Sequence, residues 1–184
     1  SGWKYELGWG VKAEKNPSRG VELGKVGGAR GDGRVLAIVN QKGGVGKSTT
    51  AVNLGAYLAV LGVPVLVVDC DPQSNATSGL GVDRSKRRGS VYEALLGSRS
   101  LDSLVVETAV KGLWCVPSSI ELAGAEVELV GELAREFRLR RALEGLAGRY
   151  SFVLLDAPPS LGLLTINTLA AAQGVLIPIQ CEYY

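Results

Sequence analysis

The 184-residue sequence contains no histidine, no methionine and only three cysteines. The absence of histidine excludes a Ser-His-Asp hydrolase, and it means that any metal site must use mainly oxygen ligands, which suits Mg²⁺. Cys70, Cys115 and Cys181 are widely spaced and form no C-x-x-C pair, so they indicate reduced thiols in a cytoplasmic protein. No apolar run reaches about 18 residues, and no membrane span is therefore predicted.

The charge is distributed unevenly along the chain. Residues 1–34 hold seven Lys/Arg and four Asp/Glu, whereas the remaining 150 residues hold thirteen and fourteen. The net charge of +2 therefore combines a leading segment of +3 with a domain of −1. Because the domain itself is almost neutral, bulk charge does not predict nucleic-acid binding.

Residues 1–33 are predicted to be a flexible glycine-rich tail. They contain nine glycines, charges of both signs and no sustained hydrophobic period. Trp3, Tyr5 and Trp9 suggest docking on a partner or on the domain, but a disordered or cloning-derived extension is the favoured interpretation. The domain is then expected to begin near Arg34.

The most informative stretch is a glycine-rich loop at residues 41–49, which read Gln-Lys-Gly-Gly-Val-Gly-Lys-Ser-Thr. An apolar run at 35–39 precedes it and is typical of a buried parallel strand. Residues 48–61 follow, with apolar residues at helical spacing. Strand, loop and helix form the context in which G-x-x-x-x-G-K-[ST] binds phosphate, although Gln41 stands where the first glycine is expected.

Each residue type in this loop suits phosphate binding. Glycines let the backbone turn several N–H groups toward one point, and the helix that begins at Ser48 adds its own N–H groups and the positive end of its dipole. Lys47 is predicted to reach the β- and γ-phosphates of a nucleotide, and the Ser48 hydroxyl to bind Mg²⁺. The predicted nucleotide-binding residues are Lys42, Gly43, Gly44, Val45, Gly46, Lys47, Ser48 and Thr49.

Two further apolar runs end in carboxylates. Residues 63–68 lead into Asp69 and Asp71, and residues 152–155 lead into Asp156. Strand residues alternate between faces, so Asp69 and Asp71 are expected to point the same way, at the end of the strand where open α/β sheets bind ligands. Two carboxylates at that place can hold Mg²⁺ through water and orient an attacking water molecule.

The three segments resemble the ParA/MinD superfamily of ATPases, and within it the ParA/Soj-type partitioning ATPases. The form K-G-G-x-G-K-[ST] at residues 42–48 is similar to the deviant Walker A loop of that superfamily. Residues 69–77 resemble the second acidic motif of ParA/Soj-type proteins, and D-A-P-P-S at 156–160 is again ParA-like. The resemblance covers residues 34–184.

The resemblance implies a role for each charged residue. Lys42 would cross a dimer interface to the phosphates of the partner's nucleotide, and Asp71 would activate or position the attacking water. Asp156 resembles the Walker B aspartate, which holds the hydration shell of Mg²⁺. Lys42 and Asp71 are accordingly the expected catalytic residues, and the expected metal residues are Ser48, Asp69, Asp71 and Asp156; the implied cofactors are ATP and Mg²⁺.

By the same resemblance, the function implied is that of a weak, partner-stimulated ATPase in chromosome or plasmid partitioning. Such a protein forms a homodimer with ATP, binds DNA without sequence preference, responds to a ParB-type partner and is cytoplasmic and nucleoid-associated. One alternative is a MinD-like membrane-associated positioning ATPase, which the Asp71-Pro72-Gln73 segment disfavours. Another alternative is an inactive truncated fragment, because family members continue with further strands and helices after the segment that ends at Tyr184.

The fold expected for 34–184 is a three-layer α/β P-loop NTPase fold with a mostly parallel sheet, incomplete at its C-terminus. Other expected elements are helices at 91–96 and 161–172, short strands at 104–106 and 113–116, and a buried strand at 175–179. Residues 120–147 are expected to form one or two helices, with Arg138, Arg140 and Arg141 on a solvated face. Their predicted inward-facing residues are Leu122, Val127, Val130, Leu133, Phe137, Leu143 and Leu146.

Overall fold

A computed structural model of the chain describes residues 4–7, 11–16, 20–23, 33–83, 85 and 88–181. The chain divides into two compact units, Ser1–Asp32 and Gly33–Tyr184. No helix of the described residues is long and apolar enough to cross a membrane.

The first unit contains a three-stranded antiparallel sheet in the order β1-β2-β3. Its strands are β1 (Lys4–Leu7), β2 (Val11–Asn16) and β3 (Gly20–Leu23). Apolar and charged residues alternate along each of them, which is the period-two pattern of a strand. That residues 1–33 form a flexible tail stays a prediction. Trp3 and Trp9 lie outside the described residues.

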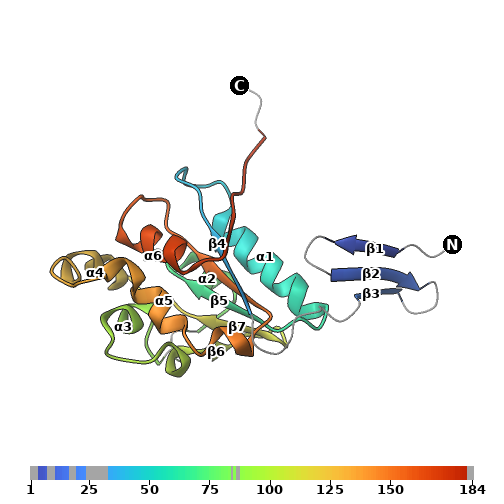
Figure 1. Cartoon of the computed structure of the whole chain (residues 1–184), viewed down its shortest axis with the longest axis horizontal. Coiled ribbons are helices and arrows are strands. Elements are labelled where there is room, and N and C mark those ends of the chain that lie inside the picture. Colours follow the sequence, from blue (N-terminus) through green and yellow to red (C-terminus); the bar gives the residue numbers. More distant parts are fainter. Residues whose placement is uncertain are drawn as a thin grey trace. The chain divides into compact units, whose positions relative to one another are not determined.

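A six-stranded sheet lies at the centre of the second unit, in the order β6-β7-β5-β8-β4-β9 (Figure 1). All neighbouring strands pair in parallel except β6, which is antiparallel to β7. This arrangement confirms the mostly parallel sheet that the sequence predicts. The strands are β4 (Arg34–Ile38), β5 (Val65–Asp69), β6 (Val106–Glu107), β7 (Leu113–Val116), β8 (Phe152–Asp156) and β9 (Gly174–Leu176).

The helices of the described residues in this unit are α1 (Lys47–Val60), α2 (Asn75–Gly79), α3 (Val91–Leu96), α4 (Leu122–Glu128), α5 (Arg138–Leu143) and α6 (Leu163–Ala171). Short 3₁₀ helices occur at Leu101–Leu104 (η2), Arg135–Phe137 (η3) and Ala147–Arg149 (η4). The helix expected at residues 91–96 is confirmed as α3. The strand expected to begin at 104 begins at Val106, because Leu101–Leu104 closes into a 3₁₀ turn capped by Ser100.

Helices cover both faces of the sheet, because its central strands are apolar on both sides. On one face α1 packs so closely that a Cβ on Gly55 would lie 3.2 Å from Val67 Cγ2 and 3.1 Å from Leu113 Cδ1. On the other face Leu66 and Leu155 belong to a core that includes residues of α3, α4, α5 and α6. Figure 1 shows α1 on one side of the sheet and α3, α4 and α5 on the other. The three-layer α/β fold is therefore confirmed.

Part of the predicted core of residues 120–147 is wrong. Val127, Val130 and Leu133 are 75%, 64% and 90% exposed, and Phe137 is also exposed. The region forms the short elements α4, η3 and α5 instead of one or two long helices. A helical spacing counted over the whole region therefore does not predict which of its residues face the core. Leu122, Leu143 and Leu146 are buried, as predicted.

The strand predicted at residues 175–179 is present as β9, but it is not buried. Val175 is 48% exposed, and Ile177 and Ile179, which follow the strand, are more exposed than Val175. Among the described residues β9 pairs only with β4, so it forms one edge of the sheet. Its apolar composition is the composition of an inner strand, which is why the sequence pattern predicts burial.

The close approach of α1 to the sheet predicts that Gly55→Leu destabilises the protein. The added side chain must displace Val67, Leu113 or Leu154, and overpacking of this kind costs about 1–3 kcal/mol. The free energy of unfolding from urea denaturation measures this cost. Val60→Leu, at an exposed position of the same helix, is the control and should change stability by less than about 0.5 kcal/mol. Equal effects of the two substitutions would contradict the packing described.

Candidate functional site

The carboxyl ends of β4, β5 and β8 meet at one edge of the sheet. Asp69 at the end of β5 and Ile38 at the end of β4 are both register partners of Asp156 at the end of β8. Parallel strands place their carboxyl ends together, so the loop after β4 and the acidic residues after β5 and β8 converge. The structure therefore brings the glycine loop and the two acidic segments together, as the sequence predicts.

The glycine loop between β4 and α1 turns through left-handed backbone conformations. Gly44 has φ +74° and Gly46, the N-cap of α1, has φ +89°. A Cβ on Gly43, Gly44 or Gly46 would meet nothing within 4 Å, so these glycines border open space. Glycine is favoured here because it adopts positive φ without steric cost and lets a ligand approach the backbone. The loop thus presents backbone N–H groups and a helix start to that space.

Lys47 begins α1 and is only 6% exposed. Its Nζ donates a hydrogen bond to the carbonyl oxygen of Lys42 at 3.2 Å, so the ammonium lies folded back over the loop. A buried ammonium with a single neutral acceptor is incompletely compensated, because one carbonyl does not replace its lost hydration. This side chain is therefore suited to bind an anion in the loop.

Residues on both sides of the loop hold it in place. Asn40 Oδ1 accepts a hydrogen bond from the Lys42 N–H at 2.9 Å, and Asn40 Nδ2 donates to the Pro178 carbonyl at 2.8 Å. Gln180 Nε2 donates to the Gly44 carbonyl at 3.2 Å. Sequence reasoning did not find these residues, although an Asn two positions before the amide that it binds is a recognised turn pattern. The pairing with residues 178–180 depends on the tertiary fold and has no local signal.

Asp69 is fully buried, and the protein satisfies its oxygens. Oδ1 accepts from the Asp71 N–H at 3.1 Å, and Oδ2 accepts from the Thr77 N–H at 2.7 Å and the Thr77 hydroxyl at 2.6 Å. Burial raises the pKa of Asp69 to about 6, and the hydrogen bonds from Thr77 and Asp71 offset part of this rise. The Thr77 Oγ1 also accepts from the Ser118 N–H at 3.0 Å, so Thr77 connects Asp69 to the loop after β7. Thr77 is a positioning residue that the sequence did not single out by itself.

Asp156 is fully buried as well, but neither of its carboxylate oxygens receives a hydrogen bond of ordinary geometry. Burial raises its pKa to about 7. The interaction of the Ser48 hydroxyl with the carboxylate and the charge of Lys47 lower this pKa, and the charges of Asp69 and Asp71 raise it. Buried polar groups without partners are rare in proteins, and at a functional site they indicate a missing ligand or ion. Among these carboxylates, Asp156 is therefore the one that a bound cation would stabilise most.

The residues present fit a magnesium ion. Asp156 offers two unpartnered oxygens with Ser48 nearby, whereas the oxygens of Asp69 are already occupied. No group of three or more His, Cys, Asp and Glu side chains with metal-binding geometry occurs among the described residues. Mg²⁺ is bound in this way in phosphate sites, by one or two protein ligands with water and substrate phosphate completing its coordination. The geometry favours Asp156 and Ser48 over Asp69 as the residues that would hold it.

A cleft of about 580 Å³ opens over the loop. Asp71, which is 6% exposed, lines this cleft and accepts a hydrogen bond at Oδ1 from the Gln73 N–H at 2.9 Å. Lys42 is exposed and is not among the lining residues, and Val45 is buried. The cleft is lined by Gly43, Gly44, Gly46, Lys47, Ser48, Thr49, Val52, Asn53, Asp71, Gln73, Asn75, Gly79 and Pro159.

A mostly parallel sheet, a glycine loop leading into α1 and acidic strand ends define a P-loop NTPase of the ParA/MinD type. Residues 33–184 match the AAA domain family, and the chain belongs to this family. It is 53% identical over 152 residues to the sporulation initiation inhibitor protein Soj of Bacillus subtilis. It is 56% identical over 152 residues to the chromosome partitioning protein ParA of Myxococcus xanthus. The chain is thus a homologue of the Soj and ParA partitioning proteins.

These alignments cover 83% of the chain but only 60% of Soj and 54% of ParA, so the chain spans little more than half the length of these relatives. An uncharacterized protein of Mycobacterium tuberculosis is 42% identical over 180 residues, which cover 97% of this chain and 57% of that protein. That alignment is longer than residues 33–184, so it includes most of the first unit. A counterpart in a natural protein argues against a cloning-derived origin of that segment.

Among solved structures, a cobyrinic acid a,c-diamide synthase from Mycobacterium smegmatis with bound ATP analogue and magnesium is similar, with a TM-score of 0.78 and 48% identity. The similarity covers 82% of this chain and 62% of that protein. The homologous fold therefore holds an ATP analogue together with magnesium in that protein.

The raised pKa values of Asp69 and Asp156 predict that the ligand-free protein loses stability as pH rises. Both pKa values exceed the ordinary value of 3.8, so between about pH 4 and 7 the folded state keeps protons that the unfolded chain has released. The melting temperature without Mg²⁺ should therefore fall from about pH 5 to 7.5. Asp156→Asn, which cannot ionise, should flatten this dependence.

The exposed Glu107 provides the control for this measurement, because Glu107→Gln removes a carboxylate away from the site. Its pH profile should parallel that of the wild type. If the Asp156→Asn profile also ran parallel to that of the wild type, the raised pKa of Asp156 would be wrong.

Proposed function

We propose that the protein is an ATP-dependent, dimerising ATPase of the ParA type that acts in chromosome or plasmid partitioning. The observation that carries this proposal is the convergence of Lys47, Ser48 and Asp71 on one cleft, with the unpartnered carboxylate of Asp156 beside Ser48. A cleft that combines a phosphate-binding loop with acidic residues at strand ends suits a nucleotide and Mg²⁺. The identity to Soj and ParA supports the partitioning role.

In this proposal the loop binds the phosphates of ATP. The N–H groups of the glycine loop and of the first turn of α1 donate to the phosphate oxygens. The Lys47 ammonium turns from the Lys42 carbonyl toward the β- and γ-phosphates, where it gains anionic acceptors in place of a neutral one. Mg²⁺ held near Ser48 and Asp156 would neutralise part of the phosphate charge.

Asp71 acts on the attacking water in this proposal. The Gln73 N–H holds Oδ1, so the carboxylate is fixed at the wall of the cleft. The backbone N–H of Asp71 is itself bound to Asp69, which is anchored by Thr77. Asp69 therefore serves to position the residue that orients water, and a rigid position is what such a residue requires.

Lys42 serves a second subunit in this proposal. Its side chain is exposed and lies outside the lining of the cleft in its own chain, which fits a residue that reaches the nucleotide of a partner subunit. Two ATP molecules brought face to face repel each other unless further cations offset their charge. The ATP-bound dimer would then bind DNA without sequence preference, and a ParB-type partner would stimulate hydrolysis at the nucleoid in the cytoplasm.

The first expected outcome separates binding from hydrolysis. Lys47→Ala should abolish binding of Mg-ATP, because the phosphates lose their nearest cation, whereas Asp71→Ala should keep binding and stop turnover. Calorimetry with a non-hydrolysable ATP analogue measures binding, and phosphate release measures turnover. Lys111→Ala, at an exposed lysine outside the cleft, should change neither. Normal binding by Lys47→Ala, or normal turnover by Asp71→Ala, would remove that residue from its proposed role.

The second expected outcome concerns the dimer. Lys42→Ala should bind ATP as a monomer but form the ATP-dependent dimer weakly, and DNA binding should decrease with it because two weak surfaces act together. Light scattering with and without ATP measures the dimer, and pull-downs with DNA and with liposomes identify its target. An ATP-dependent dimer that binds liposomes and ignores DNA would indicate a MinD-like protein. Wild-type protein that stays monomeric and inactive with ATP would indicate an inactive fragment.

A further inference from the structure

A second cavity, of about 660 Å³, lies away from the nucleotide cleft and shares no lining residue with it. Its wall comes from two segments that are distant in sequence: residues 94–102, from the end of α3 into η2, and residues 138–149, which include α5. This cavity, the arginine pocket, is lined by four arginines: Arg99, Arg138, Arg141 and Arg149. The sequence predicts only that Arg138 and Arg141 are solvated, because the contributions of Arg99 and Arg149 depend on the tertiary fold.

The arginine pocket carries a positive charge that its own acidic residues do not balance. Asp102 and Glu144 are the two acidic residues in its lining, which leaves a net charge of +2. Asp102 forms an ion pair with Arg149, and Arg138 pairs with Glu132, which lies outside the lining. Neither Arg99 nor Arg141 forms an ion pair with any of the described residues. When Glu132 is counted as well, the net charge of the group is +1, so the pocket suits an anionic ligand.

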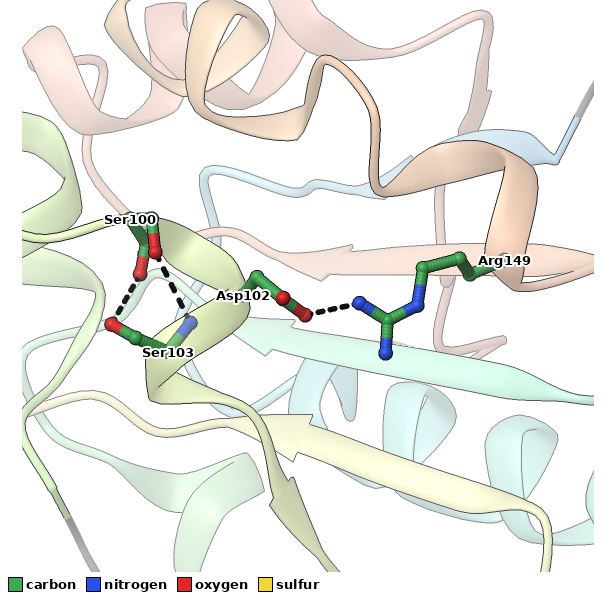
Figure 2. A network of polar contacts seen from close by, with 4 residues as sticks. All are labelled: Ser100, Asp102, Ser103 and Arg149. Atoms are coloured by element: carbon green, nitrogen blue, oxygen red, sulfur yellow. Dashed lines mark hydrogen bonds and ion pairs between the residues drawn. The ribbon is translucent and has the colours of Figure 1, made fainter.

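The positions of these groups are fixed by the surrounding structure. Ser103 Oγ donates to the Ser100 carbonyl at 2.8 Å, and the Ser103 N–H donates to Ser100 Oγ at 3.4 Å, so η2 is closed on itself. Figure 2 shows this pair of contacts beside Asp102, whose carboxylate meets the Arg149 guanidinium. Both side chains of this ion pair are exposed, so Arg149 lies at the solvent-facing rim of the pocket.

Arg138 also lines the arginine pocket and is largely buried. Its side chain is 22% exposed, and its Nε is buried without a hydrogen-bond partner. A Cβ on Gly97, which ends α3 with φ +77°, would lie 3.6 Å from its guanidinium. Glycine at this position leaves room for the arginine beside the helix end. A buried donor without an acceptor is a group whose partner a ligand can supply.

We propose that the arginine pocket binds a small organic molecule that carries a phosphate dianion. Guanidinium groups bind phosphate through two parallel hydrogen bonds, and Arg99 and Arg141 are two such groups that form no ion pair with the described residues. The volume lies within the range of small-ligand pockets, and the buried side chains of Ala94, Leu101 and Leu146 give it an apolar floor for the body of such a molecule. A concave pocket of this size suits a small ligand better than the backbone of a nucleic-acid duplex.

The test uses pyrophosphate as the probe, titrated by calorimetry into the Lys47→Ala protein so that the nucleotide cleft does not compete. Arg99→Gln and Arg141→Gln should each weaken binding about tenfold, because each removes a charge-assisted pair of hydrogen bonds. Arg140→Gln is the matched control, since Arg140 is exposed on the same helix but does not line the pocket. It should leave binding unchanged. Circular dichroism establishes that each variant is folded.

A second route uses the wild-type protein with its nucleotide cleft saturated by a non-hydrolysable ATP analogue, and it applies even if Lys47→Ala fails to fold. The same dependence on Arg99 and Arg141 should appear. Absence of pyrophosphate binding at millimolar concentration would overturn the proposal, and so would equal losses in Arg140→Gln and Arg141→Gln. Short duplex DNA is the third ligand. If it bound with the same dependence on Arg99 and Arg141 while pyrophosphate failed to bind, the pocket would be a nucleic-acid surface instead.

Discussion

The buried carboxylate of Asp156 is the group on which the rest of the site depends. It lies at the end of a central strand beside Asp69 and near Asp71, so three acidic side chains share one poorly solvated edge of the sheet. Burial of an ionised carboxylate costs several kcal/mol unless a partner compensates it. The protein compensates Asp69 with three hydrogen bonds, whereas Asp156 has, among the described residues, only the contact of the Ser48 hydroxyl and the nearby charge of Lys47. The arrangement is therefore costly in the ligand-free protein and favourable once a cation is bound.

The surrounding fold keeps this charge in place. Parallel pairing of β8 with β4 and β5 fixes the register of Asp156, and the apolar faces of these strands are covered by α1 on one side and by α3 to α6 on the other. Exclusion of water strengthens each electrostatic interaction inside, including that with Lys47. In α/β proteins the strands usually form a rigid support, and the loops at the strand ends bind the ligand.

Much of this could be predicted from the sequence because the decisive signals are local. The glycine loop, the acidic strand ends and the apolar strands are each contained in fewer than ten residues. The missed features depend on contacts between distant segments. Thr77 gains its role from Asp69 and Ser118, Gln180 from Gly44, and the arginine pocket from two segments that are far apart in the sequence. The exposure of Leu133 and Val175 was mispredicted for the same reason, since apolar character does not reveal whether a neighbour covers a residue.

The central claim is that Asp156 and the glycine loop together form a site for ATP with Mg²⁺. Calorimetric titration of ATP into wild type and Asp156→Asn, each with and without Mg²⁺, tests it most directly. The account predicts that Mg²⁺ strengthens ATP binding to the wild type and has little effect on Asp156→Asn, while both proteins bind ATP alone through the loop. An equal strengthening by Mg²⁺ in the two proteins would contradict it.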